Sequence, residues 1–159
     1  MERIMKYINR VYRVSVLDRA AAFKNLGLSG HHVSYILHVC RKPGMTQEEL
    51  AASLFVHKSS ITRQVNRLEQ ANYVERRPDA DDRRVKRIFP TALAEETYPK
   101  IIDYLEGWND VLTHELNKNE EEELLTWLKC LAKRSTEHLV EHNLGNALGL
   151  EMQNEEENA

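Results

Sequence analysis

The feature that most constrains the fold of this chain is the order of local patterns between residues 46 and 89. Thr46 stands three residues before Glu49, a capping-box spacing that predicts a short helix over residues 46–54. Apolar positions at helical spacing then predict a second short helix over residues 58–71. Two short strands, separated by a charged turn, complete the run. A short helix, a tight turn, a second helix and a β-hairpin in this order predict a winged helix-turn-helix.

The segments on either side of this unit are predicted to be helical. Apolar residues recur at helical spacing over residues 2–25, which predicts a long first helix. Thr91 is expected to cap a long fifth helix, and Asn119 to cap a sixth whose first turn is rich in glutamate. The wing strands are placed at residues 73–77 and 85–89. The chain is therefore predicted to be mainly α with a small β-hairpin wing.

The composition excludes several classes of protein. Apolar residues make up 42% and charged residues 30% of the 159 residues, so the chain can bury one core and is not disordered. No window approaches the roughly 18 consecutive apolar residues of a membrane span, and no apolar run or small-residue cleavage site follows Met1. Cys40 and Cys130 are too few for a disulfide scaffold. We therefore expect one cytoplasmic domain without membrane contact.

The net charge of −3 hides an uneven distribution along the chain. Residues 1–45 carry eight Lys and Arg against two acids, and residues 58–87 carry nine against five. Residues 115–159 carry only four against eleven. A basic surface on an otherwise acidic body is typical of a protein that binds a polyanion. Charge runs are often only solvated faces, but here one of the basic runs coincides with the predicted winged helix-turn-helix.

The second short helix has two distinct faces. Ile61, Val65 and Leu68 share one side at helical spacing and are expected to be buried. The other positions face outward: Lys58, Ser59, Ser60, Thr62, Arg63, Asn66 and Arg67. Hydroxyl groups near the start of such a helix suit phosphates and base edges, and arginine makes two hydrogen bonds to guanine. An ordinary polar helix face is the alternative explanation, and the hairpin that follows argues against it.

These residues resemble a known family. Four short segments are similar to the helix-turn-helix of MarR-type transcriptional regulators: Leu50-Ala51, Lys58-Ser59-Ser60-Ile61-Thr62-Arg63, Leu68-Glu69 and Val74-Glu75-Arg76. Asp82-Arg83-Arg84 fits the Asp-x-Arg signature of that family's wing, and Thr91 fits the threonine that begins its fifth helix. The resemblance covers about residues 28–95.

The resemblance implies a DNA-binding site and assigns its residues. In this family the wing arginine, here Arg84, enters the minor groove, and the aspartate, here Asp82, holds it in place. A narrow minor groove concentrates negative potential, so an ordered guanidinium suits it. A plain surface ion pair is the alternative for these two residues. The predicted DNA contacts are Lys58, Ser59, Ser60, Thr62, Arg63, Arg67, Asp82, Arg84 and Lys86.

The chain departs from the family pattern at four positions. Phe55 replaces the glycine of the turn between the two short helices, so this turn is expected to differ or to be strained. Asn72 replaces a glycine before the wing and tolerates a positive φ. Pro90 and Ala94 replace a leucine and a glycine near the start of the fifth helix. None of the four changes removes a predicted DNA contact.

The resemblance also supplies a partner for the helices outside the winged helix. A winged helix cannot cover the apolar stripes Ile4/Ile8/Val11 and Leu124/Leu128/Leu131, and a second copy of the chain would bury them. A twofold dimer reads two half-sites about 34–36 Å apart, so the DNA target is expected to be an inverted repeat. The expected layout is one domain over 1–159: winged helix about 28–95, dimerisation helices about 2–25 and 100–142, and an acidic tail 151–159.

A regulatory ligand is expected by resemblance alone. Family members bind small molecules, often aromatic acids, between the dimer helices and the DNA-binding lobe. The candidate contacts are Tyr12, Arg13, His31, Tyr35, His38 and Trp108, each of which ordinary packing would also explain. Cys40 is interpreted as a buried apolar residue rather than a redox sensor. His138 and His142 have a spacing that suits a metal, but without a third ligand a solvated pair is favoured.

Two other functional classes fit the sequence less well. An enzyme is disfavoured because the sequence has no nucleophile elbow, no phosphate loop and no metal-ligand cluster, and no cofactor is expected. A winged helix that only binds proteins is the stronger alternative. It would not need the outward hydroxyls and Arg63 together with Arg84 at the wing tip. The sequence therefore predicts a dimeric, sequence-specific DNA-binding regulator, a repressor that a small molecule releases.

Overall fold

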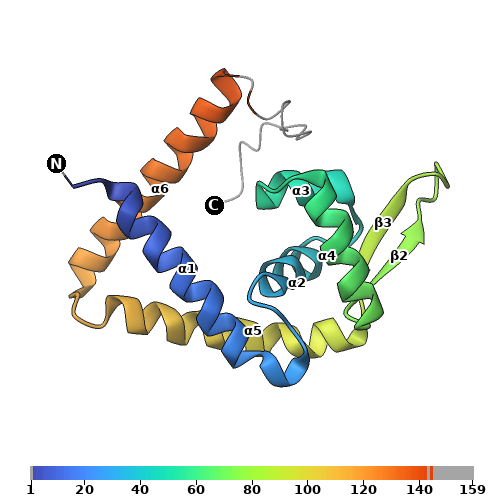
Figure 1. The fold of residues 1–159 in the computed structure, drawn as a ribbon, viewed down its shortest axis with the longest axis horizontal. Helices are drawn as coiled ribbons and strands as arrows, with labels where there is room; N and C mark the ends of the chain where they lie inside the picture. The colour runs from blue at the N-terminus through green and yellow to red at the C-terminus, as the bar shows by residue number, and fades with distance from the viewer. Residues whose placement is uncertain (1, 143, 145–159) are drawn as a thin grey trace.

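The computed structural model describes residues 2–142 and residue 144. Helices dominate it, and a small sheet lies at one end (Figure 1). Along the chain the elements are α1 (Ile4–Ala22), the 3-10 helix η1 (Lys24–Leu26), α2 (His32–Arg41), β1 (Met45–Thr46), α3 (Gln47–Leu54), α4 (Lys58–Gln70), β2 (Val74–Pro78), β3 (Lys86–Pro90), α5 (Ala92–Thr113) and α6 (Lys118–Glu141). The mainly α class with a small β wing is confirmed.

The sheet has three antiparallel strands in the order β1-β3-β2. β2 and β3 form the predicted hairpin, in which Arg76 lies opposite Ile88. Sequence reasoning missed β1, which pairs Met45 with Ile88 and Thr46 with Arg87. Two residues are too few to show an alternating pattern, so this strand has no sequence signal of its own. It joins the wing to the residue that caps α3.

A core of apolar side chains holds α2, α3, α4 and the sheet together, and we call residues 28–95 the winged-helix lobe. Ile36 of α2, Leu50 of α3, Ile61 of α4 and Ile88 of β3 are all fully buried. The core ends on Ile101 of α5, which is also fully buried. Each element thus contributes one apolar face, and the second short helix buries the face that the sequence predicts.

Helix α5 runs from the base of the wing to the far end of the molecule (Figure 1). Thr91 caps it, as predicted, because its hydroxyl accepts the backbone N–H of Ala94 at 3.3 Å. The same hydroxyl donates to the carbonyl of Asn72 at 2.6 Å, which ties the start of α5 to the start of the wing. The helix continues through Pro99.

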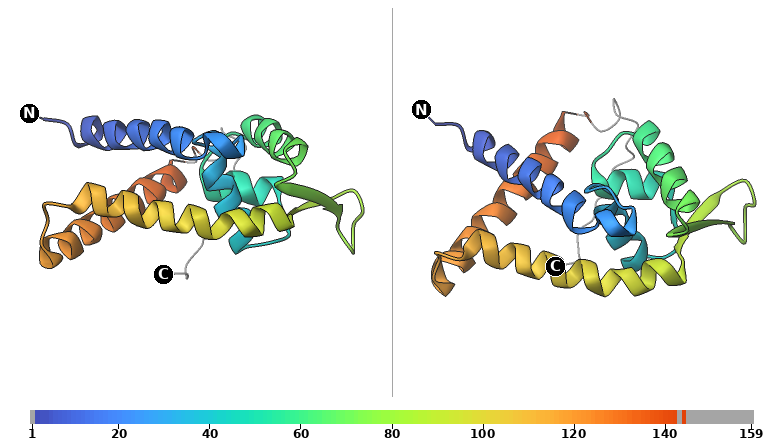
Figure 2. Two further views of the ribbon diagram at one scale, coloured as in Figure 1. Left: turned by 90° about the horizontal axis from the view of Figure 1, so that it is seen from below. Right: turned by 60° about the horizontal axis from the view of Figure 1, so that its bottom comes forward.

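Helices α1 and α6 extend beyond the winged-helix lobe (Figures 1 and 2), and we call them the end helices. Neither has a buried residue among those described. α1 touches the rest of the molecule near its C-terminal half, where Asp18 accepts a 2.6 Å hydrogen bond from Tyr104 of α5. Gly30 approaches so closely that a Cβ would lie 2.0 Å from the carbonyl oxygen of Val16. Only glycine fits this contact.

One predicted helix start is wrong. Asn117, not Asn119, caps α6, because its side chain accepts from the backbone N–H groups of Asn119 and Glu120. Glu120 in turn accepts the N–H of Asn117 and completes a capping box. Asn119 lies inside α6. In the described part of the chain, every helix is too short or too polar to cross a membrane. The predicted tail 151–159 lies outside the described residues.

Candidate nucleic-acid interface

The geometry of the helix-turn-helix begins at the start of α3. The Thr46 hydroxyl accepts the N–H of Glu49 at 3.1 Å, and the Glu49 carboxylate accepts the N–H of Thr46 at 2.7 Å. This confirms the predicted capping box, which satisfies two backbone donors that would otherwise lack partners. α3 ends at Phe55, whose φ of 52° and ψ of 43° are left-handed. The expected strain in this turn is present, because a side chain in that conformation costs about 1–2 kcal/mol.

Helix α4 starts with two side-chain contacts that hold its first turn. His57 caps it, since its Nδ1 accepts the backbone N–H of Ser59 at 3.2 Å. Lys58 forms an ion pair with Glu48 of α3, and both side chains are about half exposed. The Lys58 ammonium lowers the pKa of Glu48. The first turn of α4 is therefore set against α3, the helix that precedes it.

The predicted outward face of α4 is open to solvent. Lys58, Ser59, Thr62, Arg63, Asn66 and Arg67 are exposed, and Ser60 is half-buried. The opposite face is closed, because Ile61, Val65 and Leu68 are each at most 1% exposed. Hydroxyls at the start of the helix and arginines further along thus share one accessible surface.

Side-chain contacts also join α4 to α2 and to the wing. Nε2 of His32, in α2, lies 3.0 Å from the amide oxygen of Gln64, while Nδ1 accepts the N–H of Ser29 at 3.2 Å. A neutral imidazole protonated on Nε2 satisfies both contacts. On the other side, Arg76 of β2 donates to Asn66 of α4 at 2.6 Å and pairs with Glu69. α4 is therefore tied to α2 and to the wing, and sequence reasoning found neither tie.

The wing tip presents two exposed arginines, Arg83 and Arg84, and Arg84 is paired with Asp82. Arg84 donates from Nε to Oδ1 of Asp82 at 3.0 Å and from Nη2 to Oδ2 at 2.9 Å. The backbone N–H of Arg84 also donates to Oδ1 at 3.0 Å. The guanidinium lowers the pKa of Asp82, and the side chain of Arg84 is nevertheless 90% exposed. The ion pair that the resemblance implies is present, and Lys86 on β3 is exposed beside it.

A second aspartate, missed at the sequence level, organises the base of the wing tip. Oδ1 of Asp79 accepts the backbone N–H groups of Asp81 and Asp82 at 2.9 and 3.0 Å. Its Oδ2 pairs with Nε of Arg87, whose Nη1 donates to the carbonyl of Gly44 at 2.9 Å. The Arg87 guanidinium, followed by the two backbone N–H groups, lowers the pKa of Asp79 to about 2. Asp79 is therefore ionised near neutral pH.

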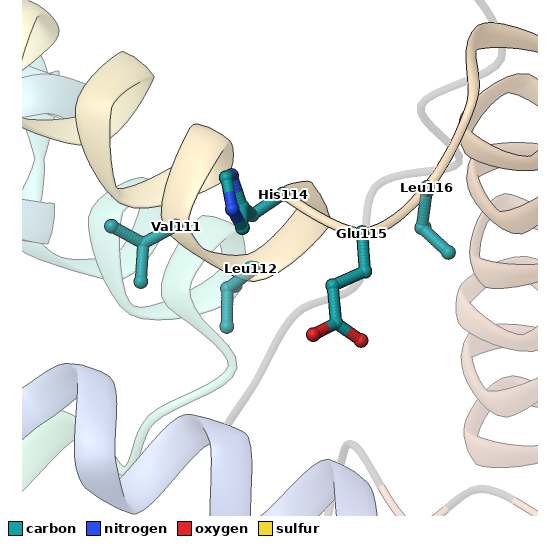
Figure 3. Close-up of a pocket in the computed structure, with 5 residues that line it drawn as sticks. All are labelled: Val111, Leu112, His114, Glu115 and Leu116. Carbon is teal, nitrogen blue, oxygen red and sulfur yellow. The ribbon is translucent and has the colours of Figure 1, made fainter.

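The residues proposed for a small-molecule site lie in different environments. Tyr35 is buried, His38 and Trp108 are half-buried, and Tyr12, Arg13 and His31 are exposed. Burial raises the pKa of Tyr35, and nearby Tyr12 raises it further. A surface cavity on α1 includes Arg13, and another at the α5–α6 junction is lined by Val111, Leu112, His114, Glu115 and Leu116 (Figure 3). The effector site stays a prediction.

The remaining sequence candidates have ordinary environments. Cys40 is half-buried, and burial raises the pKa of its thiol to about 11, which makes it unreactive near neutral pH. Cys130 is exposed. The ring centroids of His138 and His142 are 4.1 Å apart at the C-terminal end of α6. Within residues 2–142 and 144, no three His, Cys, Asp or Glu side chains gather as a metal site.

The fold and the accessible basic face together define a winged helix-turn-helix protein. A family model described as the MarR family matches residues 26–85. The HTH-type transcriptional regulator BilQ of Clostridium symbiosum is 28% identical over 140 residues, which cover 87% of this chain and 97% of that protein. Over its helix-turn-helix and most of the wing, the chain is thus similar to the MarR family of winged helix-turn-helix transcriptional regulators. This similarity supports DNA binding by the chain.

Solved structures agree with this assignment. The transcriptional regulator SlyA superposes with a TM-score of 0.83 at 28% identity, covering 86% of this chain and 96% of that one. A MarR family regulator from Listeria monocytogenes complexed with a 26mer DNA has a TM-score of 0.81 at 23% identity, covering 96% and 99%. The second structure has the same fold.

Proposed function

We propose that the protein is a homodimeric repressor that acts in the cytoplasm on an inverted-repeat DNA site. The observation that carries the proposal is the accessible face of α4, on which hydroxyls precede arginines above a closed apolar face. In this proposal Ser59, Ser60 and Thr62 bind phosphates and base edges. Arg63 and Arg67 read bases in the major groove.

The wing completes the interface in the proposal. Arg84 lies in the minor groove beside the recognition helix, and Asp82 limits the conformations of its guanidinium before DNA arrives. Less side-chain freedom is then lost on binding, which favours the complex. Lys58 and Lys86 contribute charge to the phosphate backbone.

The end helices supply the dimer. Leu124, Leu128 and Leu131 of α6 are 40–43% exposed, and Ile4 and Val11 of α1 are 62% and 45% exposed. Apolar patches of this kind mark interfaces in soluble proteins. A second copy that covers them would place two copies of α4 on one face of a DNA duplex, as a twofold inverted repeat requires.

The proposal also includes release of the protein from DNA by a small molecule, which the family resemblance implies. Tyr12, Arg13, His31, Tyr35, His38 and Trp108 are its candidate contacts. An aromatic carboxylic acid such as benzoate is the probe, and release of bound DNA is the expected result.

The test begins with selection of binding sites by the full-length protein from a random DNA library. Binding of the selected duplex is then measured by fluorescence anisotropy at several salt concentrations. Arg63→Ala is expected to cost about 1–3 kcal/mol on that duplex and to relax preference at one base position. Lys58→Ala is expected to weaken all sequences similarly and to reduce the salt slope by about 1.

The matched control is Lys100→Ala, which removes an exposed lysine of α5 that pairs with Glu96, away from α4 and the wing. It is expected to leave affinity for the selected duplex unchanged. If no sequence is enriched, or if binding does not depend on salt, the chain is instead a winged helix that binds proteins. If neither Arg63→Ala nor Lys58→Ala alters binding, α4 does not enter the groove.

A further inference from the structure

The wing tip is held by a chain of contacts that runs back to the start of α3. Its first part is the Asp79 carboxylate, whose side chain is only 12% exposed although it lies in a surface turn. One of its oxygens accepts the N–H groups of Asp81 and Asp82, and the other pairs with Arg87. Asp79 therefore uses both oxygens within the wing, and it faces inward rather than toward a DNA surface.

The second part connects the wing to the helix-turn-helix. Arg87 bridges Asp79 and the carbonyl of Gly44 through different guanidinium nitrogens. The backbone N–H of Gly44 also donates to Ile88 of β3 at 2.8 Å. Gly44 has a φ of 86°, a conformation that side chains disfavour, and it precedes Met45 of β1 directly. The turn before α3 is thus bonded to the wing.

The third part is Arg84 at the wing tip. The Arg84 side chain donates two hydrogen bonds to the carboxylate of Asp82. Asp82 can hold Arg84 in one direction only if the backbone of Asp82 is itself fixed. The backbone N–H of Asp82 donates to Oδ1 of Asp79 at 3.0 Å, which fixes it. The order of support is therefore Gly44, Arg87, Asp79, Asp82 and Arg84.

We propose that Asp79 and Arg87 are positioning residues for DNA binding, which act by fixing Asp82 and, through it, the direction of Arg84. The inference rests on the proposed function. In this proposal the inward-facing carboxylate of Asp79 increases the affinity for DNA without contacting it. It also makes the wing and the helix-turn-helix one rigid unit, so that α4 and Arg84 are aligned with each other before they meet a duplex.

The first test is Asp79→Asn, for which simple electrostatics and the positioning role predict opposite changes in DNA affinity. Removing a negative charge near a polyanion should strengthen binding. We expect Asp79→Asn to weaken binding of the selected duplex by about three- to tenfold, within the range seen for coupled neighbours. Glu75→Gln is the matched control, because it removes another wing carboxylate, one that pairs with exposed Arg77. It is expected to leave affinity unchanged or slightly higher.

A double-mutant cycle separates positioning from general damage to the fold. In an Arg84→Ala background, Asp79→Asn is expected to cause no further loss of affinity, although it still lowers the melting temperature. Asp79→Asn alone should also reduce the salt slope toward that of Arg84→Ala, because the arginine no longer engages the duplex. A purely structural role would leave the loss of affinity the same in both backgrounds.

Arg87→Lys is a second variant that keeps the net charge. A lysine cannot bridge Asp79 and Gly44 as a planar guanidinium does, so the same loss of affinity is expected. This variant also decides the question if Asp79→Asn does not fold, which far-UV circular dichroism would show.

The possible results are distinct. If the unaltered protein selects no DNA, the proposed function fails. If Arg84→Ala weakens binding and the effects of Asp79→Asn and Arg84→Ala simply add, or if Arg87→Lys binds as the unaltered protein does, the positioning role is overturned. If binding is intact but Arg84→Ala has no effect, the wing does not contribute and the inference fails with it.

Discussion

The winged-helix lobe and the end helices differ in how far their apolar side chains are buried. In the lobe, α2, α3, α4 and the sheet each contribute fully buried side chains, such as Ile36, Leu50, Ile61 and Ile88. The end helices have no buried residue among those described. Their apolar side chains lie at the surface instead, with Leu17 of α1 71% exposed.

This difference suggests a division of labour. The lobe closes its own core, so its geometry depends on local contacts such as those of His32 and Arg76 with α4. In the proposed dimer, a second copy of the chain covers the end helices. The lobe is thus suited to read one half-site, while the end helices would set the distance between two half-sites. The close approach of Gly30 to Val16 joins the lobe to α1, and Tyr104 of α5 donates to Asp18 of the same end helix.

The largest effects are expected from one substitution in each region. Ile61→Ala, in the core of the lobe, should destabilise the fold by about 2–5 kcal/mol. Leu128→Asp, on the exposed face of α6, should split the dimer and weaken DNA binding by at least about a hundredfold, since a monomer engages one half-site. Chemical denaturation measures the first effect, and sedimentation with anisotropy measures the second.

The dependence of the melting temperature on protein concentration separates the two regions further. The lobe of the Leu128→Asp protein should keep its secondary structure, and its melting temperature should no longer depend on protein concentration. Lys129→Asp, which changes a neighbouring exposed residue that is already polar, is the control and should remain dimeric. A Leu128→Asp protein that stays dimeric and binds DNA normally would show that α6 does not form the interface.

Sequence reasoning worked where the determinants are local. The capping box at Thr46, the two faces of α4 and the hairpin all follow from residues a few positions apart. It failed at α6, where Asn117 and Asn119 each precede a glutamate by three positions, so the pattern alone could not select the cap. It also missed β1, because two residues carry no periodicity.

The contacts of the candidate site were predictable only in part. Asp82 and Arg84 are two residues apart in the Asp-x-Arg wing signature, so their pairing could be predicted from the sequence. The bridge from Asp79 through Arg87 to Gly44 joins residues up to 43 positions apart, and it depends on how the hairpin folds over the turn before α3. Such contacts are properties of the tertiary structure.

A smaller effect is expected at the turn between α3 and α4, within the lobe. Phe55 is left-handed and 53% exposed, so its ring gains little burial in exchange for the backbone strain. Phe55→Gly should therefore stabilise the fold by about 1 kcal/mol, measured by thermal unfolding. The control is Asn72→Gly, at a φ of 61°, where asparagine already tolerates the conformation and the gain should be smaller. Loss of stability in Phe55→Gly would show that the ring packs usefully.

The smallest effect is expected from protonation of His32. Burial lowers its pKa below 6.5, so the unfolded chain binds the proton more readily than the folded one. Stability should be complete above about pH 6.5 and should fall below it by less than about 1.4 kcal/mol per pH unit, until the folded histidine is protonated too. Denaturation from pH 7.5 to 5 measures the change.

Replacing this histidine tests the assignment. His32→Gln should flatten the pH profile, because the group that takes up the proton is gone. A profile that is the same in both proteins would mean that the contact between α2 and α4 does not titrate.

The central claim is that the lobe reads DNA and that the end helices pair two lobes. Sedimentation of the full-length protein with its selected duplex tests both halves at once. The account predicts two protomers per duplex, on an inverted repeat whose half-sites are about 34–36 Å apart. One protomer per duplex with full affinity, or a selected site without twofold symmetry, would contradict it.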